Sequence, residues 1–207
     1  MDLVTLRLSK LLNDLKYPSG VVLDIGCADG REYSELLIKN YDYIGIDIDA
    51  NSIRKTQTKD FLGNNFKFET GNAEKLRFAD RSFDLVVCNN MLAYTKKNKV
   101  LAEVIRVLNS NGYCISLFNN TIDYSLYKIF HKTNVSLIRQ ILHSIIVIAN
   151  TSFFRLTGRK FFHTTFNTVN EIRQLLTSFD DEVDIIFVEE KDYGLGYKTI
   201  EFVFRKK

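Results

Sequence analysis

Apolar residues follow two alternating patterns along residues 20–118. Short uninterrupted apolar runs are typical of strands buried on both faces, whereas apolar residues that recur every three or four positions are typical of amphipathic helices. Strands that alternate with helices predict a doubly wound α/β sheet with parallel strands. The predicted strands cover residues 20–25, 41–47, 65–70, 82–88 and 113–118.

The segments between these strands predict helices. The clearest helix begins at Thr95 and carries apolar residues at the spacings i, i+3 and i+4. Two more helices are predicted over residues 31–39 and 51–62. A turn at Asn111-Gly112 then leads into the strand at 113–118.

The last part of the chain, residues 167–207, predicts one helix and a pair of antiparallel strands. Thr168 and Glu171 have the spacing of a capping box, so a helix should begin there and run to about Phe179. Two β-rich runs follow on a short glycine-containing connection, and strands joined in this way pair antiparallel. These two runs cover residues 183–188 and 199–204.

Charge and cysteine content narrow the class of protein. Lys and Arg number 28 against 25 for Asp and Glu, and a net charge of +3 is too small to propose nucleic-acid binding. The three cysteines show neither a CxxC pair nor a zinc spacing, so we expect reduced, mostly buried thiols, no metal site and a cytoplasmic protein. They are Cys27, Cys88 and Cys114.

Neither end of the chain nor its apolar stretches predict a membrane-spanning helix. The longest uncharged stretch, residues 140–154, has 15 residues, and a helix that crosses a bilayer needs about 20. Residues 1–19 mix charged residues with leucines, which predicts a short amphipathic N-terminal helix and no signal peptide.

A glycine-rich turn, residues 23–30, joins the first predicted strand to the helix that follows. Its sequence is Leu-Asp-Ile-Gly-Cys-Ala-Asp-Gly. Small residues at such a turn let the backbone pass close to a ligand, with helix N–H groups directed at it. Asp24 would repel a pyrophosphate and attract an ammonium group. The turn therefore favours S-adenosylmethionine over NAD, unless it is a tight turn that binds no ligand.

Two more polar positions follow the next strands. Asp47 ends the second strand, 17 residues beyond Gly30, where a carboxylate can accept both hydroxyls of a ribose. Asp47 could instead cap the next helix, although Asp49 and Asn51 are available for that role. Residues 71–74, Gly-Asn-Ala-Glu, follow the third strand and either read an adenine edge or form an ordinary Asn-containing turn.

Together these motifs resemble the class I S-adenosylmethionine-dependent methyltransferases, close to the broad type 11 group that includes UbiE-like enzymes. The resemblance implies a Rossmann-like, doubly wound sheet of seven strands in the order 3-2-1-4-5-7-6, with strand 7 antiparallel and a helical insertion after strand 5. Ala28 replaces the family's usual middle glycine, and Asn72 stands where Asp is frequent; both changes are compatible with cofactor binding. The segments that carry the resemblance are VLDIGCADG (22–30), YIGIDID (43–49), GNAEKLRF (71–78), FDLVVCNNMLAY (83–94) and VLAEVIRVLNSNGYCISLF (100–118).

The resemblance also implies which residues hold the cofactor, S-adenosylmethionine. The end of strand one and its turn would hold the methionine portion, the carboxylate after strand two the ribose, and the residues after strand three the adenine, while those after strand four line the cleft. The sequence Asn-Asn-Met-Leu at 89–92 is not the Asn-Pro-Pro-Tyr of enzymes that methylate nucleic-acid adenines or glutamine amides, so no nucleic-acid partner is expected. The implied cofactor-binding residues are Asp24, Gly26, Cys27, Ala28, Gly30, Asp47, Ile48, Asn72, Ala73, Asn89 and Asn90.

We expect a single domain, residues 1–207, with a cofactor-binding core at 20–118 and an insertion at 119–166 that crosses the cleft on the acceptor side. The insertion has six basic residues and one acid, a net charge of +5, and contains all three histidines. These features favour a small-molecule or amphipathic acceptor with an anionic part. Whether the insertion is a lid, a homodimer interface or a peripheral membrane contact through 135–162 stays open.

Two residues are candidate general bases, because the resemblance implies that the start of the sixth helix and the end of the fourth strand border the cleft. His163 and Tyr94 occupy these places, and either could take a proton from an acceptor hydroxyl. In-line transfer from a sulfonium does not require a base, since alignment of the reacting atoms supplies much of the acceleration.

The sequence thus predicts an S-adenosylmethionine-dependent methyltransferase that acts on a small-molecule or lipid- or glycan-linked acceptor, at oxygen or carbon. A short-chain NAD(P)-dependent dehydrogenase is an alternative, because Tyr124 and Lys128 fit its YxxxK motif; its TGxxxGxG turn is missing, and Asp24 disfavours a dinucleotide. A non-catalytic protein that binds S-adenosylmethionine is the other alternative, because no residue is an indispensable catalyst by sequence.

Overall fold

The computed structural model describes residues 20–30, 41–57, 66–119, 168–192 and 198–207, together with isolated positions elsewhere. Most of the predicted N-terminal helix, the helix at 31–39 and most of the insertion at 119–166 lie outside the described residues. So do His163 and the Tyr124–Lys128 motif.

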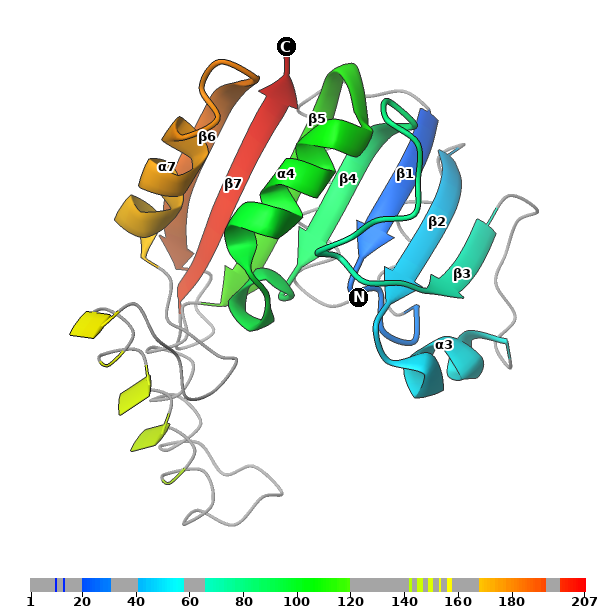
Figure 1. Ribbon diagram of the computed structural model, residues 1–207, viewed down its shortest axis with the longest axis horizontal. Helices are drawn as coiled ribbons and strands as arrows, with labels where there is room; N and C mark the ends of the chain where they lie inside the picture. Colours follow the sequence, from blue (N-terminus) through cyan, green and yellow to red (C-terminus); the bar gives the residue numbers. More distant parts are fainter. Residues whose placement is uncertain are drawn as a thin grey trace.

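Seven strands form one sheet in the order β3-β2-β1-β4-β5-β7-β6 (Figure 1). Strands β1 to β5 pair in parallel, while β7 runs antiparallel to both β5 and β6, so the predicted topology is confirmed. The strands are β1 (Gly20–Ile25), β2 (Tyr41–Asp47), β3 (Phe66–Thr70), β4 (Phe83–Asn89), β5 (Leu108–Asn119), β6 (Val183–Asp192) and β7 (Lys198–Lys206).

Strand β5 begins earlier than the sequence predicts. The predicted turn at Asn111-Gly112 is wrong, because both residues lie within the strand. Asn111 nevertheless has a φ of 65°, and the pairing of β4 with β5 shifts register between Phe83 and Leu85. The left-handed backbone that Asn-Gly favours is therefore present as an irregularity inside the strand and not as a turn before it.

The described helices begin at polar residues. Asp49 caps α3 by accepting the N–H groups of Asn51 and Ser52, and the predicted capping box of Thr168 and Glu171 is confirmed at the start of α7. Helix α4 begins two residues after the predicted start at Thr95, and a short 3-10 turn, η1, lies just before Thr95. None of the helices in these segments combines the length and apolar character that crossing a bilayer requires. The bounds are α3 (Ala50–Thr56), η1 (Leu92–Tyr94), α4 (Lys97–Val107) and α7 (Val169–Thr177).

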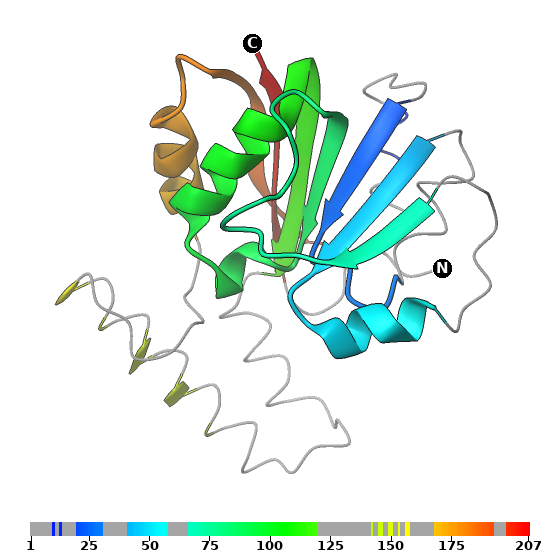
Figure 2. The same cartoon turned by 45° about the vertical axis from the view of Figure 1, so that its right-hand side comes forward.

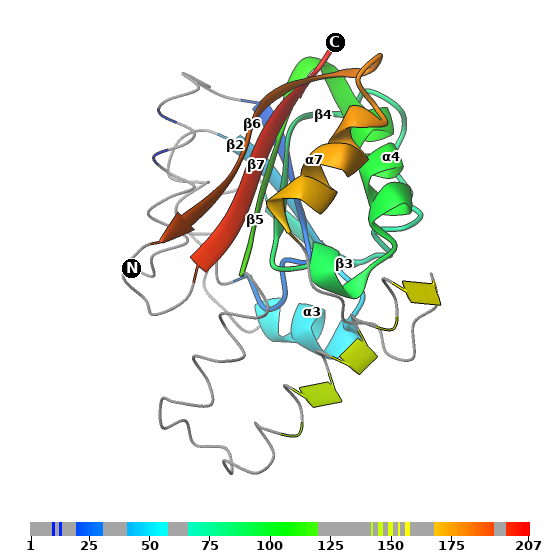
Figure 3. The ribbon, with the colours of Figure 1, turned by 90° about the vertical axis from the view of Figure 1, so that its left-hand side faces the viewer.

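Helices α4 and α7 cover one face of the sheet (Figures 1 and 3). The apolar stripe of α4, including Val100, Leu101 and Val104, packs in a cluster with strand residues such as Ile25 and Phe202. Alternate residues of the same strands form a second buried cluster on the opposite face, made of Val22, Tyr41, Tyr43, Leu85, Val87, Ile115, Leu117 and Val203. Burial on both faces explains why the strands have nearly continuous apolar sequences.

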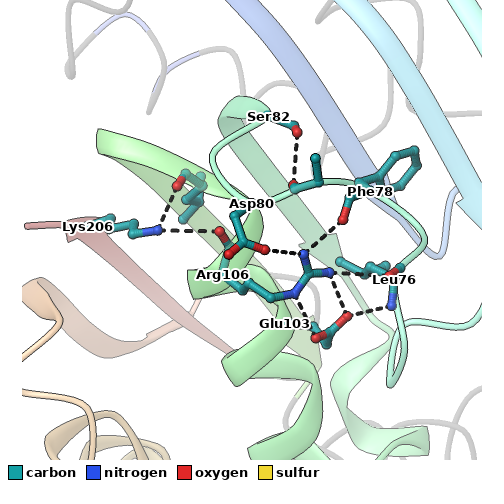
Figure 4. A network of polar contacts seen from close by, with 9 residues as sticks. Leu76, Phe78, Asp80, Ser82, Glu103, Arg106 and Lys206 are labelled. Carbon is teal, nitrogen blue, oxygen red and sulfur yellow. Dashed lines mark hydrogen bonds and ion pairs between the residues drawn. The ribbon is translucent and has the colours of Figure 1, made fainter.

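The connection from β3 to β4 contains no helix and is fixed by Arg106 of α4 (Figure 4). Its guanidinium donates to the carbonyl oxygens of Leu76 and Phe78, at 3.2 and 2.8 Å, and to the carboxylate of Asp80 at 2.7 Å. Glu103 receives two further bonds from Arg106 and one from the backbone N–H of Leu76. Hydrogen bonding to Glu103, and then to Asp80, raises the pKa of Arg106, so the group stays charged.

Arg106→Lys should lower the free energy of unfolding by about 1–3 kcal/mol, because one ammonium group cannot replace a planar fork that reaches four partners. Urea denaturation measures this difference. The matched control is Arg205→Lys, which alters an exposed pair with Asp184 and should change stability by less than about 1 kcal/mol. Equal losses in the two variants would contradict a structural role for the Arg106 network.

Glu201 is a fully buried carboxyl group in β7, with an exposed fraction of 0%. It lies between Leu117 of β5 and Glu189 of β6 in the sheet register. The hydroxyl of Thr199 donates to its Oε1 at 2.8 Å. Burial raises the pKa of Glu201 from 4.5 to about 8, so the group is mainly protonated in the folded protein at neutral pH.

Because Glu201 keeps its proton in the folded protein, we expect the free energy of unfolding to fall as the pH rises from about 4.5 towards about 8. In that pH window the unfolded chain has lost the Glu201 proton while the folded chain keeps it. Each pH unit therefore lowers the free energy of unfolding by up to about 1.4 kcal/mol. Glu201→Gln, which can still accept from Thr199, should remove this part of the slope in urea melts at a series of pH values. The exposed Glu182→Gln should leave the slope unchanged, and an equal slope in wild type and Glu201→Gln would refute the assignment.

Candidate functional site

A cavity of about 1570 Å³ opens at the carboxyl edge of the parallel strands. This is the edge near which α3 lies (Figure 2). Loops after β1, β2, β3 and β4 line the cavity, and the starts of α4 and α7 complete its wall. The predicted site residues that it brings together are Gly26, Cys27, Ala28, Asp47, Ile48, Asn72, Ala73, Asn89, Asn90 and Tyr94.

The turn after β1 adopts a left-handed backbone at three positions. Gly26, Ala28 and Gly30 have φ angles of 82°, 49° and 74°. A Cβ on Gly26 would lie 2.9 Å from the Cβ of Met91, so only glycine fits there. Ala28 holds this backbone at a cost of about 1–2 kcal/mol relative to a right-handed conformation.

Asp47 joins three of the loops that line the cavity. Its Oδ2 accepts the N–H of Ala28 at 2.9 Å, and its Oδ1 accepts the N–H of Asp49 at 2.8 Å. Its backbone carbonyl accepts the N–H of Gly71 at 2.9 Å. Both carboxylate oxygens are thus held in the cavity wall, while the helix-capping role considered for Asp47 belongs to Asp49. The lone pairs that remain on the carboxylate could accept the hydroxyls of a ribose.

The loop after β3 forms the Asn-containing turn that the sequence allowed. The Oδ1 of Asn72 accepts the N–H of Glu74 at 2.8 Å, and its carbonyl accepts the N–H of Lys75 at 3.0 Å. The carboxylate of Glu74 in turn accepts the backbone N–H of Lys96 at 2.9 Å, just before α4. These bonds fix the turn, and Asn72 and Ala73 both line the cavity.

The side chain of Asn89, at the end of β4, indicates that this cavity binds a polar ligand. Its side chain is only 6% exposed, and within the described part of the chain neither its amide oxygen nor its amide nitrogen has a hydrogen-bond partner. A buried polar group without a partner costs about 1–3 kcal/mol. Because Asn89 also lines the cavity, a ligand that satisfies this amide would recover that free energy.

Two predicted residues that the structure describes are not among those that line the cavity. Asp24 is 1% exposed and accepts the hydroxyl of Tyr43 at 2.6 Å, and Gly30 also lies outside the lining. His163 lies outside the described residues. The other candidate base, Tyr94, is 61% exposed in η1 and does line the cavity.

The cavity wall also contains residues that the sequence analysis missed. The segment Thr95–Lys99 at the start of α4 contributes three lysines, and α7 contributes Ile172 and Leu175. A sequence signal for the lysines exists, because first helical turns normally carry acidic residues, and this one carries none.

These residues fit S-adenosylmethionine. A carboxylate at the end of β2 suits ribose hydroxyls, and the buried amide of Asn89 can both donate and accept. The backbone of Gly26 leaves room for close approach, which a Cβ would fill. The cavity volume also exceeds what a nucleoside-sized ligand requires.

Comparison with known proteins shows which family this chain is similar to. The sequence profile described as "Methyltransferase domain" matches residues 17–180. An uncharacterized protein of Methanocaldococcus jannaschii is 32% identical over 136 residues, which are 62% of this chain and 55% of that protein. The ubiquinone/menaquinone biosynthesis C-methyltransferase UbiE of Desulfotalea psychrophila is 32% identical over 103 residues, 48% of this chain and 41% of that enzyme. The chain thus matches about half or less of the length of these relatives.

A solved structure extends the likeness to nearly the whole fold. The crystal structure of an S-adenosylmethionine-dependent methyltransferase from Methanosarcina mazei superposes with a TM-score of 0.68 and 24% identity. The superposition covers 95% of this chain and 96% of that one.

Asp47→Asn should weaken binding of S-adenosylhomocysteine about tenfold or more, because an amide NH₂ cannot accept one of the two backbone N–H groups that hold the carboxylate. Isothermal titration calorimetry measures the affinity. Asp42→Asn is the control, since Asp42 is an exposed residue of the same strand. Unchanged affinity in Asp47→Asn would show that the bridged loops do not form the binding site.

Proposed function

The chain belongs to the class I S-adenosylmethionine-dependent methyltransferases, and on this premise we propose that it methylates a small-molecule or lipid- or glycan-linked acceptor at carbon or oxygen. UbiE, one of its relatives, carries the name of a C-methyltransferase, and this supports carbon as one possible target atom. The family rests on the match over residues 17–180. The acceptor and the atom that receives the methyl group are our proposal.

The residues around the cavity have separate tasks in this proposal. The carboxylate of Asp47 accepts the ribose hydroxyls, and the turn of Asn72 and Ala73 faces the adenine. When bound, S-adenosylmethionine supplies a methyl group on a positively charged sulfur, which an aligned acceptor atom takes by in-line displacement. The protein's main contribution is alignment of the reacting atoms in a cavity that its loops hold in shape.

A proton acceptor is needed only for some acceptor groups. Tyr94 lines the cavity and is exposed enough to reach a ligand, so it is the candidate base among the described residues. His163 is the candidate from the insertion. A carbon or oxygen acceptor that is already nucleophilic needs neither residue.

The observation that most supports this function is that the buried amide of Asn89 and the fixed carboxylate of Asp47 line one cavity. A purely structural role would leave the amide of Asn89 without compensation for its burial. The pair also joins a neutral polar group to an anionic one, which suits a ligand that carries hydroxyls and a positive charge.

Purified protein supplied with methyl-labelled S-adenosylmethionine and small-molecule, lipid and glycan fractions should transfer label to one of them and release S-adenosylhomocysteine in equal amount. Mass spectrometry should show the product with one added methyl group, and Asp47→Asn should lower the initial rate about tenfold when cofactor is limiting. Asp42→Asn should keep the wild-type rate. Tight S-adenosylhomocysteine binding with no label in any fraction would instead identify a non-catalytic binding protein.

A further inference from the structure

The start of α4 places a basic cluster in the cavity wall. Lys96, Lys97 and Lys99 all line the cavity, together with Asn98 between them. Lys96 is the residue before the helix and makes no side-chain capping bond, and the first turn of α4 contains no acidic residue. Positive charge at a helix N-terminus is unfavourable, because the N–H groups there already carry partial positive charge.

Two of the three lysines, Lys96 and Lys99, have no ion-pair partner among the described residues. By contrast, lysines elsewhere on the sheet pair with glutamates, as the Lys67–Glu69 and Lys198–Glu190 contacts show. The two glutamates in the cavity wall are engaged with backbone N–H groups: Glu74 accepts from Lys96, and Glu171 accepts from Thr168.

Apolar side chains line the same cavity beside the lysines. Met91 precedes η1, and Ile172 and Leu175 lie on α7. Leu175 is only partly buried against the core, so part of its surface remains available to a ligand. The wall formed by α4 and α7 therefore combines positive charge with apolar surface.

Asn89 gives independent evidence that this cavity holds a ligand. Its amide is more than nine-tenths buried, lines the same cavity and has no hydrogen-bond partner among the residues that the structure describes. The basic cluster thus lies in a cavity that also contains a buried amide without a described partner, and is not an isolated charged surface.

We propose that the acceptor is an anionic amphipath whose phosphate or carboxylate group binds Lys96 and Lys99, while its apolar part packs against Leu175. This inference rests on the proposed methyl transfer and adds the chemical class of its acceptor. An anion at the start of α4 interacts favourably with both the ammonium groups and the helix N–H groups. The lysines at the start of α4 then form an anion subsite within residues 20–118, which does not depend on the basic residues of the insertion.

The test uses decyl phosphate and decanoate as anionic probes and decanol as the neutral one, each below the concentration at which it forms micelles. Calorimetry on protein saturated with S-adenosylhomocysteine should show both anionic probes binding about tenfold more tightly than decanol. The tighter of the two anions identifies phosphate or carboxylate as the preferred group, and either result supports the subsite.

Lys96→Gln/Lys99→Gln should lower the affinity for the anionic probes about tenfold and leave the affinity for S-adenosylhomocysteine unchanged. Lys67→Gln/Lys191→Gln is the matched control, because it removes the same charge at positions that do not line the cavity. An equal loss in both double variants, or equal binding of decanol and the anions, would overturn the proposal.

The proposed contact between the apolar part of the acceptor and Leu175 has a separate test. Leu175→Ser should reduce the preference of the protein for decyl phosphate over butyl phosphate, and thermal denaturation checks that the variant stays folded. An unchanged preference in the folded variant would overturn the apolar contact. If the probes bind through the lysines but S-adenosylhomocysteine does not bind at all, the methyl-transfer proposal fails while the anion subsite stands.

Discussion

The cavity depends on one residue at the end of β2. The carboxylate and the carbonyl of Asp47 together accept three backbone N–H groups, one each from the loops after β1, β2 and β3. Loops at the edge of a parallel sheet have no ladder of their own, so without such bonds their backbone would exchange among conformations. A cavity whose walls are fixed before a ligand arrives loses less conformational entropy on binding.

A second set of bonds fixes the connection from β3 to β4, whose first residues line the cavity. Arg106 and Glu103 hold the β3–β4 connection against α4, and Glu74 ties the turn after β3 to the residue before that helix. In each case a charged side chain satisfies backbone groups that no helix or strand satisfies. The connection lacks a helix, and these bonds hold it against α4.

Two buried polar side chains lie towards the carboxyl edge of the sheet. Asn89, Leu117 and Glu201 are neighbours across β4, β5 and β7, so the buried amide and the buried acid occupy one row of the sheet. Asn89 lines the cavity and has no hydrogen-bond partner among the described residues, whereas Glu201 accepts from Thr199 and does not line the cavity. The free-energy cost of burying an unpaired amide therefore falls at the cavity, which is typical of a binding site.

The sequence determined which segments form strands and that the last two of them pair antiparallel, because continuous apolar runs report burial on both faces and a short connection forces antiparallel pairing. The order of the strands and most of the residues around the cavity were predicted through the resemblance to the methyltransferase family. The sequence also identified Thr168 as a helix cap and offered Asp49 or Asn51 for the cap of α3. It did not show that Asp24 lies beneath the cavity against Tyr43, that Asp47 bridges three loops, or that Lys96 and Lys99 share a wall with Leu175. Those contacts join residues far apart along the chain, so the pairing of β1 with β2 and the packing of α4 and α7 on the sheet decide which side chains meet.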